Sequence, residues 1–150
     1  QLIFTMPNAD AGGLVLMEMI NNFVKQDKNA HAYSSLGQQR YLSCVSLVDA
    51  VVGNSSSGII EAPSFKKPTI NIGSRQLGRI KADSVIDCEA TKSSILAALH
   101  KAYSPEFQAT LLSVKNPYEG EKTCEKIMDI LMSTDLSNIL AKQFFDIKLD

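Results

Sequence analysis

Cysteine is scarce in this sequence, and no two cysteines lie close together. Cys44, Cys88 and Cys124 are odd in number, widely spaced and free of any CxxC pair. Disulfide-built domains and structural zinc sites need paired or clustered cysteines, so this pattern argues against both. We therefore expect three small buried thiols, no bound metal and a reducing, cytoplasmic location.

An excess of charge of either sign is also missing. Fifteen Lys and Arg stand against sixteen Asp and Glu, which gives a formal net charge of −1. Proteins that bind nucleic acid or anionic membranes present a basic field, and this composition supplies none. We expect neither nucleic acid nor a membrane as a partner, so any anion site has to be local.

Long apolar runs are missing as well. No stretch approaches the roughly 20 residues that span a bilayer, and Gln1-Leu2-Ile3-Phe4 lacks the residue order of a signal peptide. The chain begins without Met and directly in a strand-like run, so we expect a fragment or a processed chain with functional residues upstream.

What is present is the composition of one folded domain. The 150 residues are 45% apolar and 21% charged, ordinary values for a globular protein. Short apolar runs, expected to be strands, alternate with segments of helical periodicity, which predicts an α/β domain with a Rossmann-like parallel sheet and flanking helices. The expected strands are 2–6, 31–36, 50–52, 69–72 and 85–88, and the expected helices are 13–26, 38–47, a short one at 58–62, one from Thr91 and one over 119–132.

Ligands of such sheets bind beyond the carboxyl ends of the strands. The loop after the third strand, Gly53 to Ser57, is rich in glycine and serine and leads into a helix. Small side chains, hydroxyls and unpaired backbone N–H groups at a helix start suit a phosphate group. An ordinary strand-to-helix turn is the other interpretation of this loop.

Three charged residues lie on consecutive loops or helix starts of the same sheet edge. Glu61 lies about one turn into the helix, where its carboxylate can accept hydrogen bonds from ribose hydroxyls. Arg75 and Arg79 follow the fourth strand, where a guanidinium can reach phosphate oxygens. Each taken alone is equally a solvated surface charge, and only their joint placement indicates a site.

Two longer runs resemble one enzyme family. Gly53-Asn54-Ser55-Ser56-Ser57-Gly58-Ile59-Ile60-Glu61-Ala62-Pro63 and Pro68-Thr69-Ile70-Asn71-Ile72-Gly73-Ser74-Arg75-Gln76-Leu77-Gly78-Arg79 are closely similar to the hydrolysing UDP-N-acetylglucosamine 2-epimerases of sialic acid biosynthesis. Pro7-Asn8-Ala9-Asp10-Ala11-Gly12-Gly13 resembles their opening loop. The resemblance runs from near Phe4 to at least Met132, and it implies the second, C-terminal Rossmann-like domain of a GT-B-type two-domain fold.

The resemblance also implies roles for individual residues. It puts Ser55 and Ser56 on the diphosphate of UDP, Glu61 on the ribose hydroxyls, Arg75 beside the phosphates and Tyr41 beside the uracil. The expected UDP-binding residues are Ser55, Ser56, Ser57, Gly58, Glu61, Arg75 and Tyr41, with Asn8, Asp10 and Arg79 as further candidates. Asp10 is equally a helix cap, and Tyr41 is equally a core residue.

Members of the family eliminate UDP to form a glycal and then add water with inversion at C2, without a cofactor. The resemblance implies that this part of the protein stabilises the leaving UDP through Arg75, while the acid and base groups lie upstream of Gln1. His31 and His100 match no catalytic position and are expected to be structural. We therefore expect no catalytic acid or base in this chain and no activity of the chain by itself.

The segment 134–150 is too apolar for a solvated tail, so it either folds over this domain or packs on a neighbouring domain or subunit. The resemblance implies that it packs on the N-terminal domain of the same protein, or otherwise on another copy in a homo-oligomer. Two alternatives to a UDP-N-acetylglucosamine 2-epimerase stay open. One is a 2-epimerase of a UDP-linked diacetamido sugar in legionaminic acid synthesis, and the other is a non-catalytic sugar-phosphate sensor.

Overall fold

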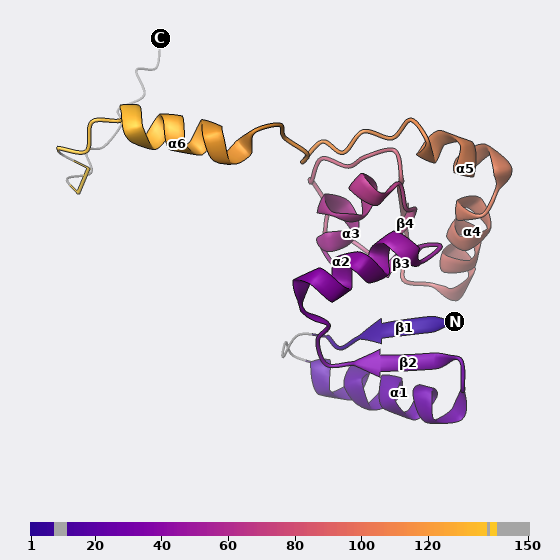
Figure 1. The fold of residues 1–150 in the computed structure, drawn as a ribbon. Coiled ribbons are helices and arrows are strands. Elements are labelled where there is room, and N and C mark those ends of the chain that lie inside the picture. Colours follow the sequence, from indigo (N-terminus) through magenta and orange to yellow (C-terminus); the bar gives the residue numbers. More distant parts are fainter. Residues whose placement is uncertain (8–11, 138, 141–150) are drawn as a thin grey trace, which may run out of the picture. The chain divides into compact units, whose positions relative to one another are not determined.

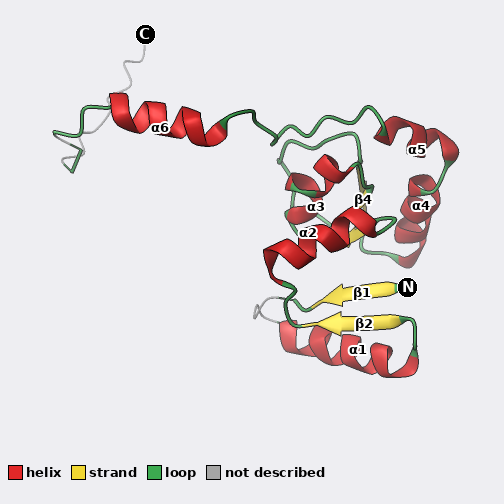
Figure 2. Cartoon of the chain, viewed as in Figure 1, coloured by secondary structure: helices red, strands yellow, loops and turns green. Residues whose placement is uncertain are grey.

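Strands and helices alternate along the chain in the computed structural model, which describes residues 1–7, 12–137 and 139–140 (Figures 1 and 2). The helices and strands follow the predicted order, and the predicted boundaries differ from the observed ones by up to a few residues. The elements are β1 Leu2–Thr5, α1 Gly13–Gln26, β2 Ala30–Tyr33, α2 Gly37–Leu47, β3 Val51–Gly53, α3 Ser57–Ile60, the 3-10 helix η1 Ala62–Phe65, β4 Thr69–Ile72, β5 Val85–Cys88, α4 Lys92–Ala102, α5 Pro105–Leu111 and α6 Thr123–Ser133.

All strand pairs are parallel, so the predicted fold class is confirmed. β1 pairs with β2, and β4 lies between β3 and β5, with Gly53 opposite Asn71 and Asn71 opposite Asp87. The strands form two sheets, whereas the sequence predicted one. Strands β1 and β3, which belong to different sheets, each leave an apolar side chain uncovered, with Ile3 44% and Val52 51% exposed. Since carboxyl ends of neighbouring parallel strands lie at one edge, the loops after β3 and β4 are adjacent.

The main core lies between the three-stranded sheet and the two helices that follow it. Ile70 of the central strand is fully buried, because a strand with a neighbour on each side and helices on its faces has no contact with water. The residues that pack there are Ile70, Ala82, Ile86, Ala98, Ala102, Phe107, Leu111 and Val114. This core supports the end of β4, where the loop that carries Arg75 and Arg79 (the arginine loop) begins.

The helices differ from expectation in three places. α1 packs on β2, but its apolar face is only partly covered, with Leu14 82% exposed. α5 was not predicted, although Ser104 accepts a hydrogen bond from the Phe107 amide and Pro105 occupies the first turn, a recognised start signal. The apolar stripe of α6 is exposed, including Ile127 and Met128.

The chain divides into two compact units, Gln1–Pro117 and Tyr118–Asp150. The predicted separation of a tail at 134–150 stays a prediction, because residues 138 and 141–150 lie outside the described part of the chain. Among the described residues, no helix combines the length and the apolar character needed to cross a membrane. The predicted site lies in the first unit, Gln1–Pro117.

Candidate functional site

The loop after β3 folds into a tight turn that opens α3. The Gly58 N–H donates to the Ser55 carbonyl at 3.3 Å, the Ile59 N–H to the Ser56 carbonyl at 3.0 Å, and the Ser57 N–H to the Ser55 hydroxyl at 3.4 Å. Within the described part of the chain, the amides of Ser55 and Ser56 have no acceptor. These two amides, rather than the whole loop, are therefore the donors that a phosphate can use.

The helix that follows this loop is short, as the sequence predicted. α3 spans only four residues, and its Ser56 N-cap makes no side-chain hydrogen bond. Because a macrodipole is the sum of aligned peptide dipoles, one turn contributes little of the attraction expected from a longer helix. An anion here would be held by individual N–H groups and hydroxyls.

Gly58 is the one predicted UDP ligand that lies in neither hollow of the site. It is buried against β4, and a Cβ at this position would lie 2.5 Å from Cγ2 of Thr69. The Thr69 hydroxyl donates to the Gly58 carbonyl at 2.7 Å. The observed reason for glycine here is therefore the close approach of α3 to β4.

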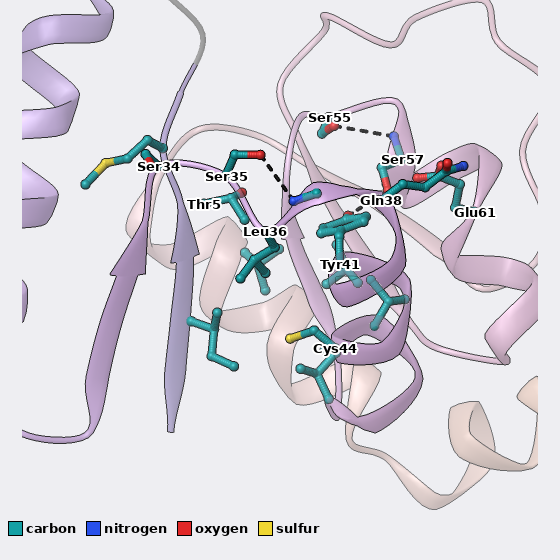
Figure 3. A pocket seen from close by; sticks show the side chains of 18 residues that line it. Thr5, Ser34, Ser35, Leu36, Gln38, Tyr41, Cys44, Ser55, Ser57 and Glu61 are labelled. Carbon is teal, nitrogen blue, oxygen red and sulfur yellow. Dashed lines mark hydrogen bonds between the residues drawn. The ribbon is translucent and has the colours of Figure 1, made fainter.

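The first hollow has a volume of about 650 Å³ and contains several of the predicted residues. Figure 3 shows Tyr41, Ser55, Ser57 and Glu61 around it, together with the loop after β2. The Tyr41 and Ser57 hydroxyls share a hydrogen bond of 2.6 Å, which orients the serine. Glu61, half-buried at the end of α3, brings a carboxylate to the same wall. This arrangement offers acceptors and donors suited to a polyhydroxylated ligand.

The second hollow, of about 800 Å³, contains the positive charge of the site. Arg75 and Arg79 line it from the loop after β4, and Ser55 and Ser56 line it from the loop after β3. Gly12 and Gly13, where α1 begins, also border it. Ser55 borders both hollows, so the serine loop separates a side with hydroxyls and a carboxylate from a side with two guanidinium groups.

Gln76 is a site residue that the sequence analysis missed. Its side chain is buried, with 4% exposure, and its Nε2 donates to the Asn54 carbonyl at 2.8 Å. It also lines the second hollow beside Arg75. Glutamine is usually exposed, and the neighbouring arginines and glycines indicate a loop, so no local pattern marked it as buried.

An ion pair holds the far end of the arginine loop. The Lys81 ammonium contacts both carboxylate oxygens of Asp87 at 2.8 and 2.7 Å, and the Asn71 amide donates to the same carboxylate at 2.6 Å. Burial raises the pKa of Asp87, but the hydrogen bonds from Lys81 and Asn71 and the ammonium charge outweigh burial and lower it overall. The loop is thereby attached to β5.

The other candidates fall into three groups. Asn8 and Asp10 lie outside the described residues, and α1 begins after Gly12, whose φ of 87° needs glycine. His31 and His100 are exposed and border neither hollow. Among the described residues, no three or more His, Cys, Asp and Glu side chains gather in a way that could hold a metal ion.

The expectation of three buried thiols is wrong. Cys44 is half-buried at the first hollow, and Cys88 is half-buried in β5, but Cys124 is exposed on α6. The helical pattern placed Cys124 on an apolar stripe that this chain leaves uncovered. Burial, together with the nearby Asp87 charge, raises the pKa of the Cys88 thiol, so that group is a poor nucleophile.

Comparison with known sequences adds a family to this geometry. Residues 1–132 match the family described as UDP-N-acetylglucosamine 2-epimerase. A GDP/UDP-N,N'-diacetylbacillosamine 2-epimerase (hydrolyzing) of Campylobacter jejuni is 42% identical over 148 residues, which are 97% of this chain and 38% of the relative. A UDP-N,N'-diacetylbacillosamine 2-epimerase (hydrolyzing) of Legionella pneumophila is 35% identical over 95% of this chain and 37% of its own length. A UDP-N-acetylglucosamine 2-epimerase of Neisseria meningitidis is 27% identical over 99% of this chain and 39% of its own length. The chain thus spans about two fifths of each of these relatives.

Proposed function

We propose, because this chain belongs to the UDP-N-acetylglucosamine 2-epimerase family, that it forms the UDP-binding part of a hydrolysing UDP-sugar 2-epimerase. The observation that supports this most is the meeting of the two hollows at Ser55. A UDP-sugar is built as a nucleoside, a diphosphate and a sugar in line. A site with hydroxyls and a carboxylate at one end and two arginines at the other matches that order.

In the proposed complex, the nucleoside lies in the first hollow. Glu61 accepts hydrogen bonds from the two ribose hydroxyls, since a carboxylate has no donor of its own and binds paired hydroxyls well. The half-buried Tyr41 lies toward the uracil, and its hydroxyl orients Ser57 through their 2.6 Å hydrogen bond. The diphosphate then reaches Ser55 and Ser56, whose amides have no acceptor within the described part of the chain.

In the proposed reaction, this chain stabilises the leaving group. Negative charge grows on the diphosphate as the sugar C1–O bond breaks, and Arg75 with the serine-loop amides interacts more strongly with that charge than with the intact substrate. Elimination gives a glycal, and addition of water then gives the epimer at C2. We propose that the proton-transfer groups and the rest of a GT-B-type cleft belong to the N-terminal domain of the same protein.

Two sugars compete as the substrate. UDP-N-acetylglucosamine follows from the family description and from the Neisseria relative. A UDP-linked diacetamido sugar is favoured by the names of the Campylobacter and Legionella relatives, which are more similar to this chain. Kinetics of the full-length protein with both sugars distinguishes them, because the correct substrate has the larger kcat/KM.

Binding of UDP by the full-length protein tests the proposal directly. Calorimetric titration should give UDP binding that falls more than about tenfold in Glu61→Ala, since hydrogen bonds to a charged group are worth about 1.5–3 kcal/mol. Glu89→Ala is the matched control, because Glu89 borders neither hollow. Preference for a sugar monophosphate without uracil, unaffected by Glu61→Ala, would instead support a sugar-phosphate sensor and reject the epimerase assignment.

A further inference from the structure

A buried amide joins the two loops that carry the phosphate-binding groups. Gln76 lies in the turn after β4, where the Leu77 N–H donates to the Ser74 carbonyl at 2.9 Å. Its Nε2 reaches across to the Asn54 carbonyl at 2.8 Å. β3 and β4 are paired neighbours, so their following loops lie close enough for one side chain to connect them.

The partner of this amide, Asn54, lies next to the predicted phosphate-binding amides. Asn54 immediately precedes Ser55 and Ser56, whose amides have no acceptor among the described residues. A backbone carbonyl carries partial negative charge and would repel a diphosphate if it turned toward the ligand. The Gln76 donor occupies the Asn54 carbonyl, and this bond restricts the conformations open to the loop.

The other end of the Gln76 amide is also informative. Its Oε1 is buried and has no hydrogen-bond partner among the described residues. Unpartnered buried acceptors are rare in native proteins and need a reason. Gln76 lines the second hollow together with Arg75 and Arg79. A guanidinium of that hollow is a suitable donor, whereas a ligand in solvent has no access to a buried atom.

We propose that Gln76 is a positioning residue for the diphosphate. It holds the serine loop and the arginine loop at one separation, so that the amides of Ser55 and Ser56 and the guanidinium of Arg75 converge on the same two phosphates. Binding donors that are already in place loses less conformational entropy than ordering two independent loops. The inference rests on the proposed UDP site and adds to it a residue that acts through others.

The test compares two substitutions that remove the same kind of bond. Gln76→Met in the full-length protein keeps the length of the side chain and removes both polar ends. Gln108→Met is the matched control, because Gln108 Nε2 donates to the Ala102 carbonyl at 2.6 Å and Gln108 borders neither hollow. Binding of UDP and of uridine, which lacks phosphates, is measured for both variants and for the wild type.

We expect Gln76→Met to weaken UDP binding roughly tenfold and to leave uridine binding unchanged, whereas Gln108→Met changes neither. Gln76→Glu, which keeps the shape and loses the N–H donors, should weaken UDP binding further because its carboxylate repels the diphosphate. Gln76→Glu also tests the positioning role if Gln76→Met does not fold. Equal losses for UDP and uridine, or wild-type UDP affinity in both Gln76 variants, would overturn the positioning role.

Hydrogen exchange without ligand separates this inference from the proposed function. The amides of Gly58 and Ile59, which donate to the Ser55 and Ser56 carbonyls at 3.3 and 3.0 Å, should exchange faster in Gln76→Met than in Gln108→Met, because only the first variant frees the Asn54 carbonyl and loosens the serine loop. Unchanged exchange rates overturn the loop connection whatever the ligand is. An exchange difference between the two variants, together with a wild-type protein that does not bind UDP, would instead overturn the proposed function and leave the loop connection in place.

Discussion

Gly58 illustrates how a single missing side chain decides local packing. Its sequence context, a serine-rich turn, suggested a ligand contact, but the residue is buried where α3 crosses β4. The Thr69 methyl occupies the space that a Cβ would need, and the Thr69 hydroxyl is bonded to the Gly58 carbonyl. Any larger residue therefore has to displace α3 or rotate Thr69.

Gly58→Ala should destabilise the protein by about 1–3 kcal/mol, the usual effect of overpacking. The intrinsic helix preference for alanine, about 1 kcal/mol, offsets only part of this. Urea unfolding of the wild type and the variant measures the difference. The double variant Gly58→Ala/Thr69→Ser lacks the clashing methyl and keeps the hydroxyl, so it should recover much of the loss. No recovery would show that the Thr69 methyl is not the cause.

Among elements, the connection from β4 to β5 matters most for the site, because it carries Arg75, Gln76 and Arg79. Gln76 attaches its first part to the serine loop, and Lys81 attaches its last part to Asp87 of β5. Asn71 on β4 donates to the same carboxylate. The two ends are therefore held by side chains from neighbouring strands, which limits the positions that the arginines can take.

The Asp87 interactions predict a pH dependence of stability. The pKa of Asp87 is lowered from its ordinary value of 3.8 on folding. Its contribution is therefore fully present above about pH 4 and is lost as the pH falls through the lower folded-state value. The wild type should be more stable than Asp87→Asn at neutral pH, and the difference should shrink in acid. Because the Asp87 side chain is 55% exposed, we expect an effect near the 0.2–1 kcal/mol of partly exposed pairs.

Thermal unfolding between pH 2 and pH 7 measures this difference. Lys81→Met removes the cation of the same ion pair. Its effect on stability should not add to that of Asp87→Asn, because both variants remove the Lys81–Asp87 interaction. A constant difference between the wild type and Asp87→Asn over the whole pH range would contradict the assignment.

The missed helix α5 is an element that the sequence did signal. Ser104 followed by Pro105 and Glu106 combines a cap, a first-turn proline and an acidic first turn. Its seven residues are too few for a clear apolar period, and the apolar positions Phe107 and Leu111 recur only once. For α6 the reverse holds. Its apolar stripe is clear in the sequence and predicted a helix, but the stripe is exposed in the structure. Periodicity thus located helices without telling which of them are covered.

At the scale of the whole molecule, this chain corresponds to about two fifths of its relatives. The proposed reaction therefore needs the full-length protein, and so does the test of Arg75. Arg75→Ala should lower kcat by more than it raises the dissociation constant of the substrate, because its proposed partner charge grows during bond breaking. Removal of a donor at such a charge typically lowers kcat about 10²–10³-fold.

Steady-state and single-turnover kinetics with the UDP-sugar separate the two effects. Arg79→Ala is an informative comparison, since Arg79 lines the same hollow four residues further along the loop. Unchanged turnover in Arg75→Ala would remove Arg75 from the proposed mechanism, while leaving the proposed nucleoside contacts of Glu61 and Tyr41 untouched.

Local patterns were enough to predict the alternation of strands and helices, the positions of the serine and arginine loops and the family, because periodicity, turn chemistry and motifs are local properties of the chain. Three contacts could be seen in the folded chain but not in its sequence: Gln76 with Asn54, Gly58 with Thr69 and Tyr41 with Ser57. These contacts join residues 11 to 22 positions apart. They follow from strand pairing and helix packing, which bring distant segments together and leave no repeating pattern in either segment.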